Sequence, residues 1–123
     1  MCRNLKDKKV LLVDDDDNNL KLASAILSIF KMDITCVNNG LDAIDKLNED
    51  SFDLIIMDLY MPVMNGIDCI KYIRENLFLS TPIIILTAGI IDFHNELEKY
   101  VKLCINKPYN KSKLRNAVNE YID

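Results

Sequence analysis

The sequence predicts an α/β fold: one parallel, five-stranded sheet with helices on both faces. Five short apolar runs alternate with five segments whose apolar residues recur at helical spacing. The runs are almost wholly apolar, which is typical of strands buried on both faces of a parallel sheet. The 123 residues contain no linker, repeat or low-complexity stretch. We therefore expect residues 1–123 to form a single domain.

The first half of the chain contains three strands and two helices. Strands are expected at Lys9–Val13, Asp33–Val37 and Phe52–Met57. Four aspartates and two asparagines follow the first strand, and residues of these types cap helices. The helix after them has apolar residues from Leu20 to Phe30 at helical spacing. A shorter second helix carries Leu41, Ala43, Ile44 and Leu47.

The second half repeats the alternation. A loop from Asp58 to Gly66 precedes a third helix, lined by Ile67, Ile70, Tyr72, Ile73 and Leu77. Strands are expected at Pro82–Leu86 and Val101–Asn106, with a weakly amphipathic helix, Asp92–Tyr100, between them. Leu114, Val118 and Ile122 mark a last helix over Lys111–Tyr121.

Composition excludes several classes of protein. Lys and Arg number 15 against 19 Asp and Glu, so the net charge is −4, and Trp is absent. Such a chain is not expected to bind nucleic acid directly. No signal-peptide region or membrane span is visible, so a cytoplasmic location is expected. The four cysteines form no CxxC pair and His occurs once, so we expect free thiols rather than a zinc site.

Polar side chains follow four of the five strands. Asp14 and Asp15 end the first strand, Asp58 the third, Thr87 the fourth and Lys107 the fifth. Each alone has a simpler reading, since Asp often caps a helix and Lys is usually solvated. Together, at the edge where open α/β sheets bind ligands, they indicate a site.

The chemistry of this set points to phosphoryl transfer. Three clustered carboxylates repel one another and raise each other's pKa, which a hard cation such as Mg²⁺ relieves. A cation, the Lys107 ammonium and the Thr87 hydroxyl would together stabilise a phosphoryl group in transit. Asp58 would then be the nucleophile, forming an acyl phosphate.

Four segments resemble the receiver domain of two-component response regulators. They are VLLVDDDDNN (10–19), FDLIIMDLYMPVMNG (52–66), PIIILTAG (82–89) and INKP (105–108). The resemblance implies a flavodoxin-like, doubly wound (βα)5 fold with strand order 2-1-3-4-5. It implies a phosphoacceptor signalling domain rather than an enzyme, with at most self-phosphorylation and autodephosphorylation activity.

The resemblance also implies the residues of a metal site that binds Mg²⁺ or Mn²⁺. Asp15, Asp58 and the main-chain carbonyl of Tyr60 correspond to its direct ligands. Asp14 corresponds to the acid that holds a metal-bound water.

Further roles concern the phosphoryl group. Asp58 corresponds to the phosphoacceptor, Lys107 to the phosphate-pairing lysine before a cis proline, and Thr87 to the switch hydroxyl. The implied donor is a phosphohistidine on a sensor histidine kinase or phosphotransfer protein. The implied output is a switched surface that binds a downstream protein, with no membrane partner.

The sequence departs from the family pattern in its second half. Cys104 stands where the family usually has the aromatic residue that couples to Thr87. The segment from Thr87 to Lys107 is about two residues short, and Tyr100 replaces a customary glycine before the last strand. We also expect the bulky Tyr60 to shield an acyl phosphate on Asp58 from water.

Two alternatives remain open. A haloacid-dehalogenase-like, Mg²⁺-dependent phosphohydrolase also uses paired aspartates, and Asp14 and Asp16 have that spacing. However, Asn18 is unusual there, and the chain is short for that fold. The chain is otherwise compatible with a free-standing regulator or with a receiver excised from a hybrid histidine kinase or larger response regulator.

Overall fold

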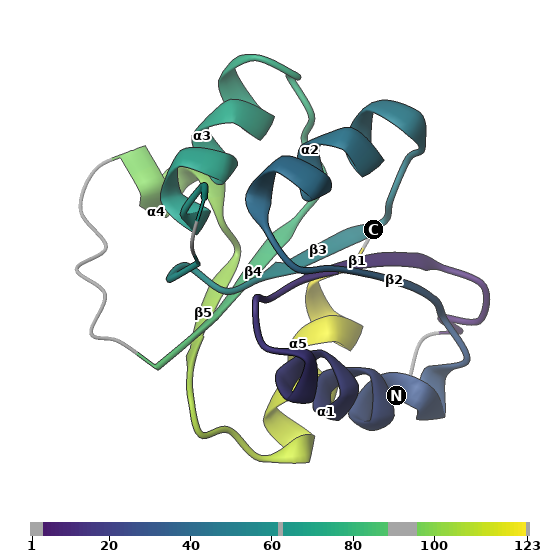
Figure 1. The fold of residues 1–123 in the computed structure, drawn as a ribbon. Coiled ribbons are helices and arrows are strands. Elements are labelled where there is room, and N and C mark those ends of the chain that lie inside the picture. The colour runs from purple at the N-terminus through teal and green to yellow at the C-terminus, as the bar shows by residue number, and fades with distance from the viewer. Residues whose placement is uncertain (1–3, 62, 89–95, 123) are drawn as a thin grey trace.

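The computed structural model describes residues 4–61, 63–88 and 96–122. Its core is one parallel five-stranded sheet in the order β2-β1-β3-β4-β5, so the predicted fold class is confirmed (Figure 1). The strands are β1 (Lys9–Val13), β2 (Asp33–Val37), β3 (Leu54–Met57), β4 (Ile83–Thr87) and β5 (Leu103–Asn106). Because β1 lies beside β3, the strand order reverses at this pair, which is where such sheets bind ligands.

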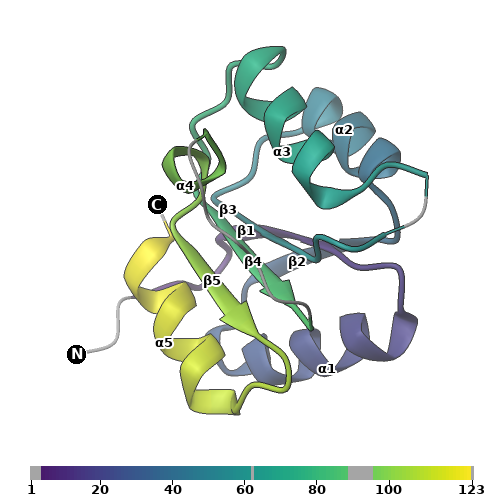
Figure 2. The same ribbon diagram turned by 90° about the vertical axis from the view of Figure 1, so that its left-hand side faces the viewer.

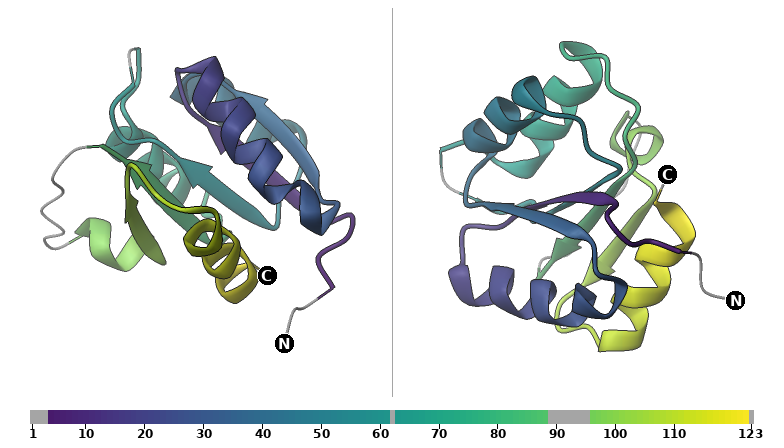
Figure 3. Two further views of the ribbon diagram at one scale, coloured as in Figure 1. Left: turned by 90° about the horizontal axis from the view of Figure 1, so that it is seen from below. Right: turned by 90° about the vertical axis from the view of Figure 1, so that its right-hand side faces the viewer.

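Helices cover both faces of the sheet (Figure 2). They are α1 (Asp17–Leu27), α2 (Gly40–Glu49), α3 (Gly66–Glu75), α4 (Glu96–Tyr100) and α5 (Lys111–Tyr121). The α1 and α5 helices pack on one face, and α2 and α3 pack on the other (Figure 3). In the described part of the chain, no helix has the length and apolar content needed to span a bilayer.

The strands alternate their side chains between two apolar cores, one under each helical layer. Leu11, Ile55 and Ile85 belong to the core beneath α2 and α3. Leu12 and Ile56 belong to the core beneath α1 and α5. With both faces buried, the central strands are apolar apart from Lys9 at the start of β1 and Thr87 at the end of β4, close to the pattern that the sequence predicts.

Several predicted boundaries are corrected by one to three residues. The first helix ends at Leu27 and continues as a 3₁₀ turn through Phe30. The third strand begins at Leu54 rather than Phe52. Just before it, the Lys9 backbone N–H donates to the Asp53 side-chain carboxylate, at 2.8 Å, instead of to a backbone carbonyl. The expected fourth helix, 92–100, is described from residue 96 onward, and residues 92–95 lie outside the described part.

The face that α3 buries differs from the prediction. Ile67 and Tyr72 are 37% and 38% exposed, whereas Cys69 is fully buried beside Ile70. The Cys69 thiol lies 3.6 Å from the carbonyl oxygen of Gly40. Burial raises its pKa to about 12. Cys36, Cys69 and Cys104 are free thiols, as expected, and Cys2 lies outside the described residues.

The Arg74 guanidinium joins α3 to the segment between α3 and β4 and to the last residue of α4. It donates to the carbonyl oxygens of Leu79 and Thr81, both at 2.7 Å, and twice to that of Tyr100, at 2.8 and 3.2 Å. The Tyr100 hydroxyl in turn donates to Glu75 at 2.9 Å. Tyr100, which replaces a customary glycine, therefore fixes the end of the short α4 helix to α3.

Candidate functional site

The site forms where β1 and β3 end side by side. Val13 pairs with Met57, so the next residues, Asp14 and Asp58, leave the sheet together. The Asp58 N–H donates to the Val13 carbonyl at 2.9 Å, which extends the ladder by one residue. One carboxylate oxygen each from Asp14, Asp15 and Asp58 lies within 4.8 Å of the others. The sheet topology thus brings the three predicted carboxylates together.

Lys107 supplies a positive charge to this cluster. Its ammonium lies 2.9 Å from Oδ2 of Asp14 and 3.5 Å from Oδ2 of Asp58. The three side chains are largely buried, at 16%, 9% and 11% exposure for Lys107, Asp14 and Asp58. Water therefore screens these charges less than it would at the surface.

Burial and charge shift two pKa values. Burial raises the pKa of Asp58, and the Asp14 carboxylate adds to that shift, while the Tyr60 N–H and Lys107 oppose it without cancelling it. Burial alone would lower the pKa of Lys107, but its bonds to Asp14 and Asp58 outweigh burial and raise it. The predicted repulsion among carboxylates therefore contributes at Asp58, although desolvation is the larger cause.

Backbone donors hold the carboxylates in place. Oδ1 of Asp14 accepts the Asp16 N–H at 3.0 Å, and Oδ1 of Asp58 accepts the Tyr60 N–H at 3.2 Å. Each carboxylate thus has one oxygen fixed by its own loop and the other facing Lys107. The four consecutive aspartates have different roles. The Asp16 carboxylate accepts the Asn18 N–H at 2.8 Å and caps α1, a role that the sequence analysis expects of residues in this run.

The other predicted site residues lie outside the cluster of carboxylates and lysine. Thr87 is fully buried, and its carbonyl accepts the Lys107 N–H at 2.7 Å. The peptide bond from Lys107 to Pro108 is cis, as expected. The Tyr60 side chain is 56% exposed. Cys104 lies on β5 opposite Ile85, packs against the α2–α3 core rather than among the carboxylates, and has a pKa raised by burial.

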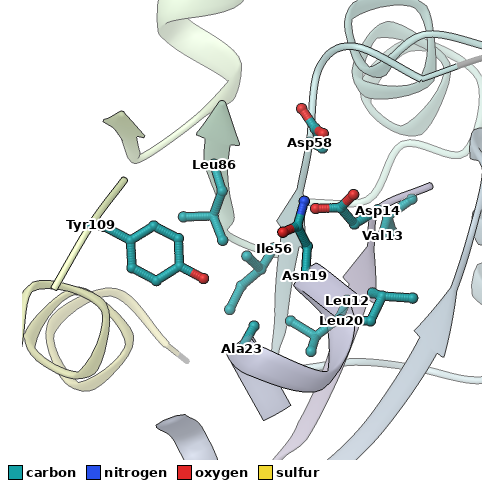
Figure 4. A pocket seen from close by; sticks show the side chains of 10 residues that line it. All are labelled: Leu12, Val13, Asp14, Asn19, Leu20, Ala23, Ile56, Asp58, Leu86 and Tyr109. Atoms are coloured by element: carbon teal, nitrogen blue, oxygen red, sulfur yellow. The ribbon is translucent and has the colours of Figure 1, made fainter. Parts of the chain in front are cut away.

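A small cavity next to the carboxylates contains two polar residues that the sequence analysis missed. Asn19 and Tyr109 line it together with Asp14 and Asp58, above an apolar floor (Figure 4). The floor consists of Leu12, Val13, Leu20, Ala23, Ile56 and Leu86. Asn19 is the last residue of the quoted segment 10–19 and Tyr109 directly follows the quoted segment 105–108, but the sequence analysis assigned neither residue a role.

A family model for the response regulator receiver domain matches residues 10–119. The chain belongs to this family. Members are signalling phosphoacceptors rather than classical enzymes, so the phosphohydrolase alternative is set aside. Receiver domains interact with histidine kinases or phosphotransfer proteins.

Relatives include both regulators and kinases. The chain is 40% identical to a transcriptional regulatory protein CpxR homolog of Haemophilus influenzae, over 86% of this chain and 46% of that protein. It is 44% identical to the autoinducer 2 sensor kinase/phosphatase LuxQ of Vibrio vulnificus, over 65% of this chain and 9% of that protein. The chain therefore spans less than half the length of these relatives.

A solved structure shares the fold. It is the receiver domain of a sensor histidine kinase from Pseudomonas aeruginosa, which holds a magnesium ion in its active site cleft. The TM-score is 0.81 at 28% identity, and the match covers 93% of this chain and 96% of that one. The donor set here suits such a cation, since three carboxylates face one ammonium and leave a formal charge of −2.

Proposed function

We propose that this chain is a single receiver domain that takes a phosphoryl group from a phosphohistidine onto Asp58. One Asp58 carboxylate oxygen attacks phosphorus, the bond from phosphorus to the histidine nitrogen breaks, and an acyl phosphate forms. The observation that carries the proposal is the position of Asp58: it leaves the sheet beside Asp14, and the Lys107 ammonium lies next to both. The donor would be a sensor histidine kinase or a phosphotransfer protein.

The acidic cluster would hold Mg²⁺ or Mn²⁺ through Asp15, Asp58 and the Tyr60 carbonyl, with Asp14 accepting from a metal-bound water. When bound, the cation would neutralise charge that develops on the phosphoryl oxygens. Lys107 would supply the second positive charge there. The geometry supports this division, because the Lys107 ammonium lies 2.9 Å from Asp14 but 3.5 Å from Asp58.

The signal would pass through Thr87 to a downstream protein. The Thr87 carbonyl already binds the Lys107 backbone, so both residues would respond to a phosphoryl group on Asp58. Cys104 would replace the usual aromatic partner of the switch. Because its thiol is small and partly buried, the response should depend less on steric exclusion than in a receiver with an aromatic residue there.

Tyr60 would set how long the phosphoryl group survives. Its ring is 56% exposed, and its backbone N–H binds the Asp58 carboxylate. A bulky side chain two residues after Asp58 would restrict the approach of water to the acyl phosphate. We expect Tyr60→Ala to speed autodephosphorylation, and an unchanged lifetime would rule this role out.

Intact-protein mass spectrometry tests the proposal. The chain is mixed with a phosphorylated histidine phosphotransfer protein and Mg²⁺, and gain of one phosphoryl group is followed. Asp58→Asn should abolish the gain, and Lys107→Met should slow it. Asp45→Asn serves as the matched control, since Asp45 is exposed on α2. Phosphorylation of Asp58→Asn at the wild-type rate would show that another residue accepts the group.

A further inference from the structure

Asn19 stands beside the carboxylates without an assigned role. It is the third residue of α1 and is partly buried. Its side chain lines the cavity that Asp14 and Asp58 also line, and Figure 4 shows the amide nitrogen at the end toward Asp14, a place that the amide oxygen takes when the amide group turns over. The position therefore places a neutral hydrogen-bonding group within the charged site.

The hydrogen bond that a side chain at this helix position often makes is made here by another residue. A polar side chain at the third position often reaches back to the backbone N–H of the capping residue. Here the cap is Asp16, and its N–H is bound by Oδ1 of Asp14. Among the residues that the structure describes, the Asn19 side chain has no hydrogen-bond partner. Its amide is therefore available to a group inside the cavity.

The chemistry of a hydrated cation indicates which group that is. Mg²⁺ keeps several of its waters when it binds to protein carboxylates. A water bound to a cation uses its oxygen lone pair on the metal and can then only donate hydrogen bonds. It needs acceptors, and an amide oxygen is one. Groups that orient metal-bound waters commonly change metal affinity by 10–100-fold.

We propose that Asn19 is a positioning residue of the cation site. Its amide oxygen accepts a hydrogen bond from a metal-bound water, beside the water that Asp14 holds. This inference rests on the proposed binding of Mg²⁺ by the acidic cluster. The floor of the cavity, which includes Leu20 and Ala23, is apolar, so the acceptors that line the cavity are the Asn19 amide, the Tyr109 hydroxyl and the two carboxylates.

Metal affinity, measured without any phosphodonor, tests the inference. Mg²⁺ is titrated into the full chain by isothermal calorimetry. Asn19→Leu keeps the size of the side chain but removes the acceptor, and we expect the dissociation constant to rise about tenfold. Asn19→Asp keeps an acceptor oxygen and should bind at least as tightly as wild type. Asn18→Leu is the matched control, because Asn18 is the exposed neighbour on the same helical turn.

A structural effect on α1 is distinguished by unfolding in EDTA. The three variants should unfold there at the same urea midpoint as wild type. If Asn19→Leu binds Mg²⁺ like wild type while Asp14→Asn binds it weakly, Asn19 has no positioning role. The proposed binding of Mg²⁺ by the acidic cluster would then still be supported. If Asn19→Asp is weakened as much as Asn19→Leu, the acceptor role is wrong. Wild-type protein that does not bind Mg²⁺ would overturn both the proposed metal site and this inference.

Discussion

Gly66 is the residue whose smallest substitution should disturb the site most. It begins α3, and its N–H donates to the Leu59 carbonyl at 2.8 Å. A Cβ atom placed on it would lie 2.6 Å from the Asp58 carbonyl oxygen and 2.7 Å from the Leu59 Cα. Both are backbone atoms that cannot rotate away. Ordinary contacts begin at 3.4 Å, so in Gly66→Ala the loop that carries Asp58 must move by about 0.8 Å.

That displacement sets the expected size of two effects. Overpacking of this kind typically destabilises a domain by about 1–3 kcal/mol. In a chain of this length, that corresponds to a melting temperature lower by roughly 4–12 °C. A reacting group misplaced by about 1 Å can lose on the order of 100-fold in rate. We therefore expect Gly66→Ala to remain folded at 25 °C but to accept phosphate about 100-fold more slowly.

Gly40 provides a matched control at the start of α2. There a Cβ atom would meet the Met64 Cγ at 3.0 Å and the Met64 Cβ and carbonyl oxygen at 3.1 Å. The contacts are longer, and the methionine side chain is flexible. Gly40→Ala should cost less than about 1 kcal/mol in urea denaturation. The reasoning would be refuted if both variants changed stability equally, or if Gly66→Ala kept the wild-type phosphorylation rate.

Three further predictions follow from charge and burial. Ion pairing raises the pKa of Lys107 above its unfolded value of 10.5, so its stabilisation is present below that pH and lost as pH rises through the folded pKa. In EDTA, the stability difference between wild type and Lys107→Met should be level from about pH 8 to 10 and shrink at higher pH. Arg74→Met leaves backbone carbonyls without their donor, so urea denaturation should show a free energy of unfolding lower by about 2–4 kcal/mol. Arg74→Lys should restore little of that free energy, because an ammonium lacks the planar set of donors of a guanidinium. With the other two cysteines replaced by serine, exposed Cys36 should react with a disulfide reagent in the native state and buried Cys69 only on unfolding; equal rates would contradict that order.

Parts of this fold and site followed directly from local sequence patterns. Strands buried on both faces are almost wholly apolar, so the polar residues after each apolar run mark where the strand ends. Asp14, Asp58 and Lys107 stand at such ends, so the topology alone predicts that they meet. The capping role of Asp16 followed from its place before a helical pattern.

Other features depend on packing between distant segments, which local patterns do not specify. Arg74 binds carbonyls from the loop after α3 and from the end of α4, and no local pattern in the sequence indicates either contact. The exposure of Ile67 was predicted wrongly because helical spacing gives a stripe of apolar residues but not which edge of the stripe faces the sheet. Asn19 was missed because an asparagine at this position is expected to bind the backbone N–H of the helix cap. In the structure Asp14 accepts that N–H instead, which the sequence pattern does not reveal.

The balance of charge in the site explains why four consecutive aspartates are compatible with folding. Asp16 caps α1 and Asp17 lies in its first turn, which leaves Asp14 and Asp15 to join Asp58. Lys107 lies closer to Asp14 than to Asp58, and the pKa of Asp58 stays raised. The ammonium is therefore placed closer to Asp14 than to the carboxylate that would react. If Asp58 is a ligand of the proposed cation, a divalent metal should raise the stability of wild type more than that of Asp58→Asn.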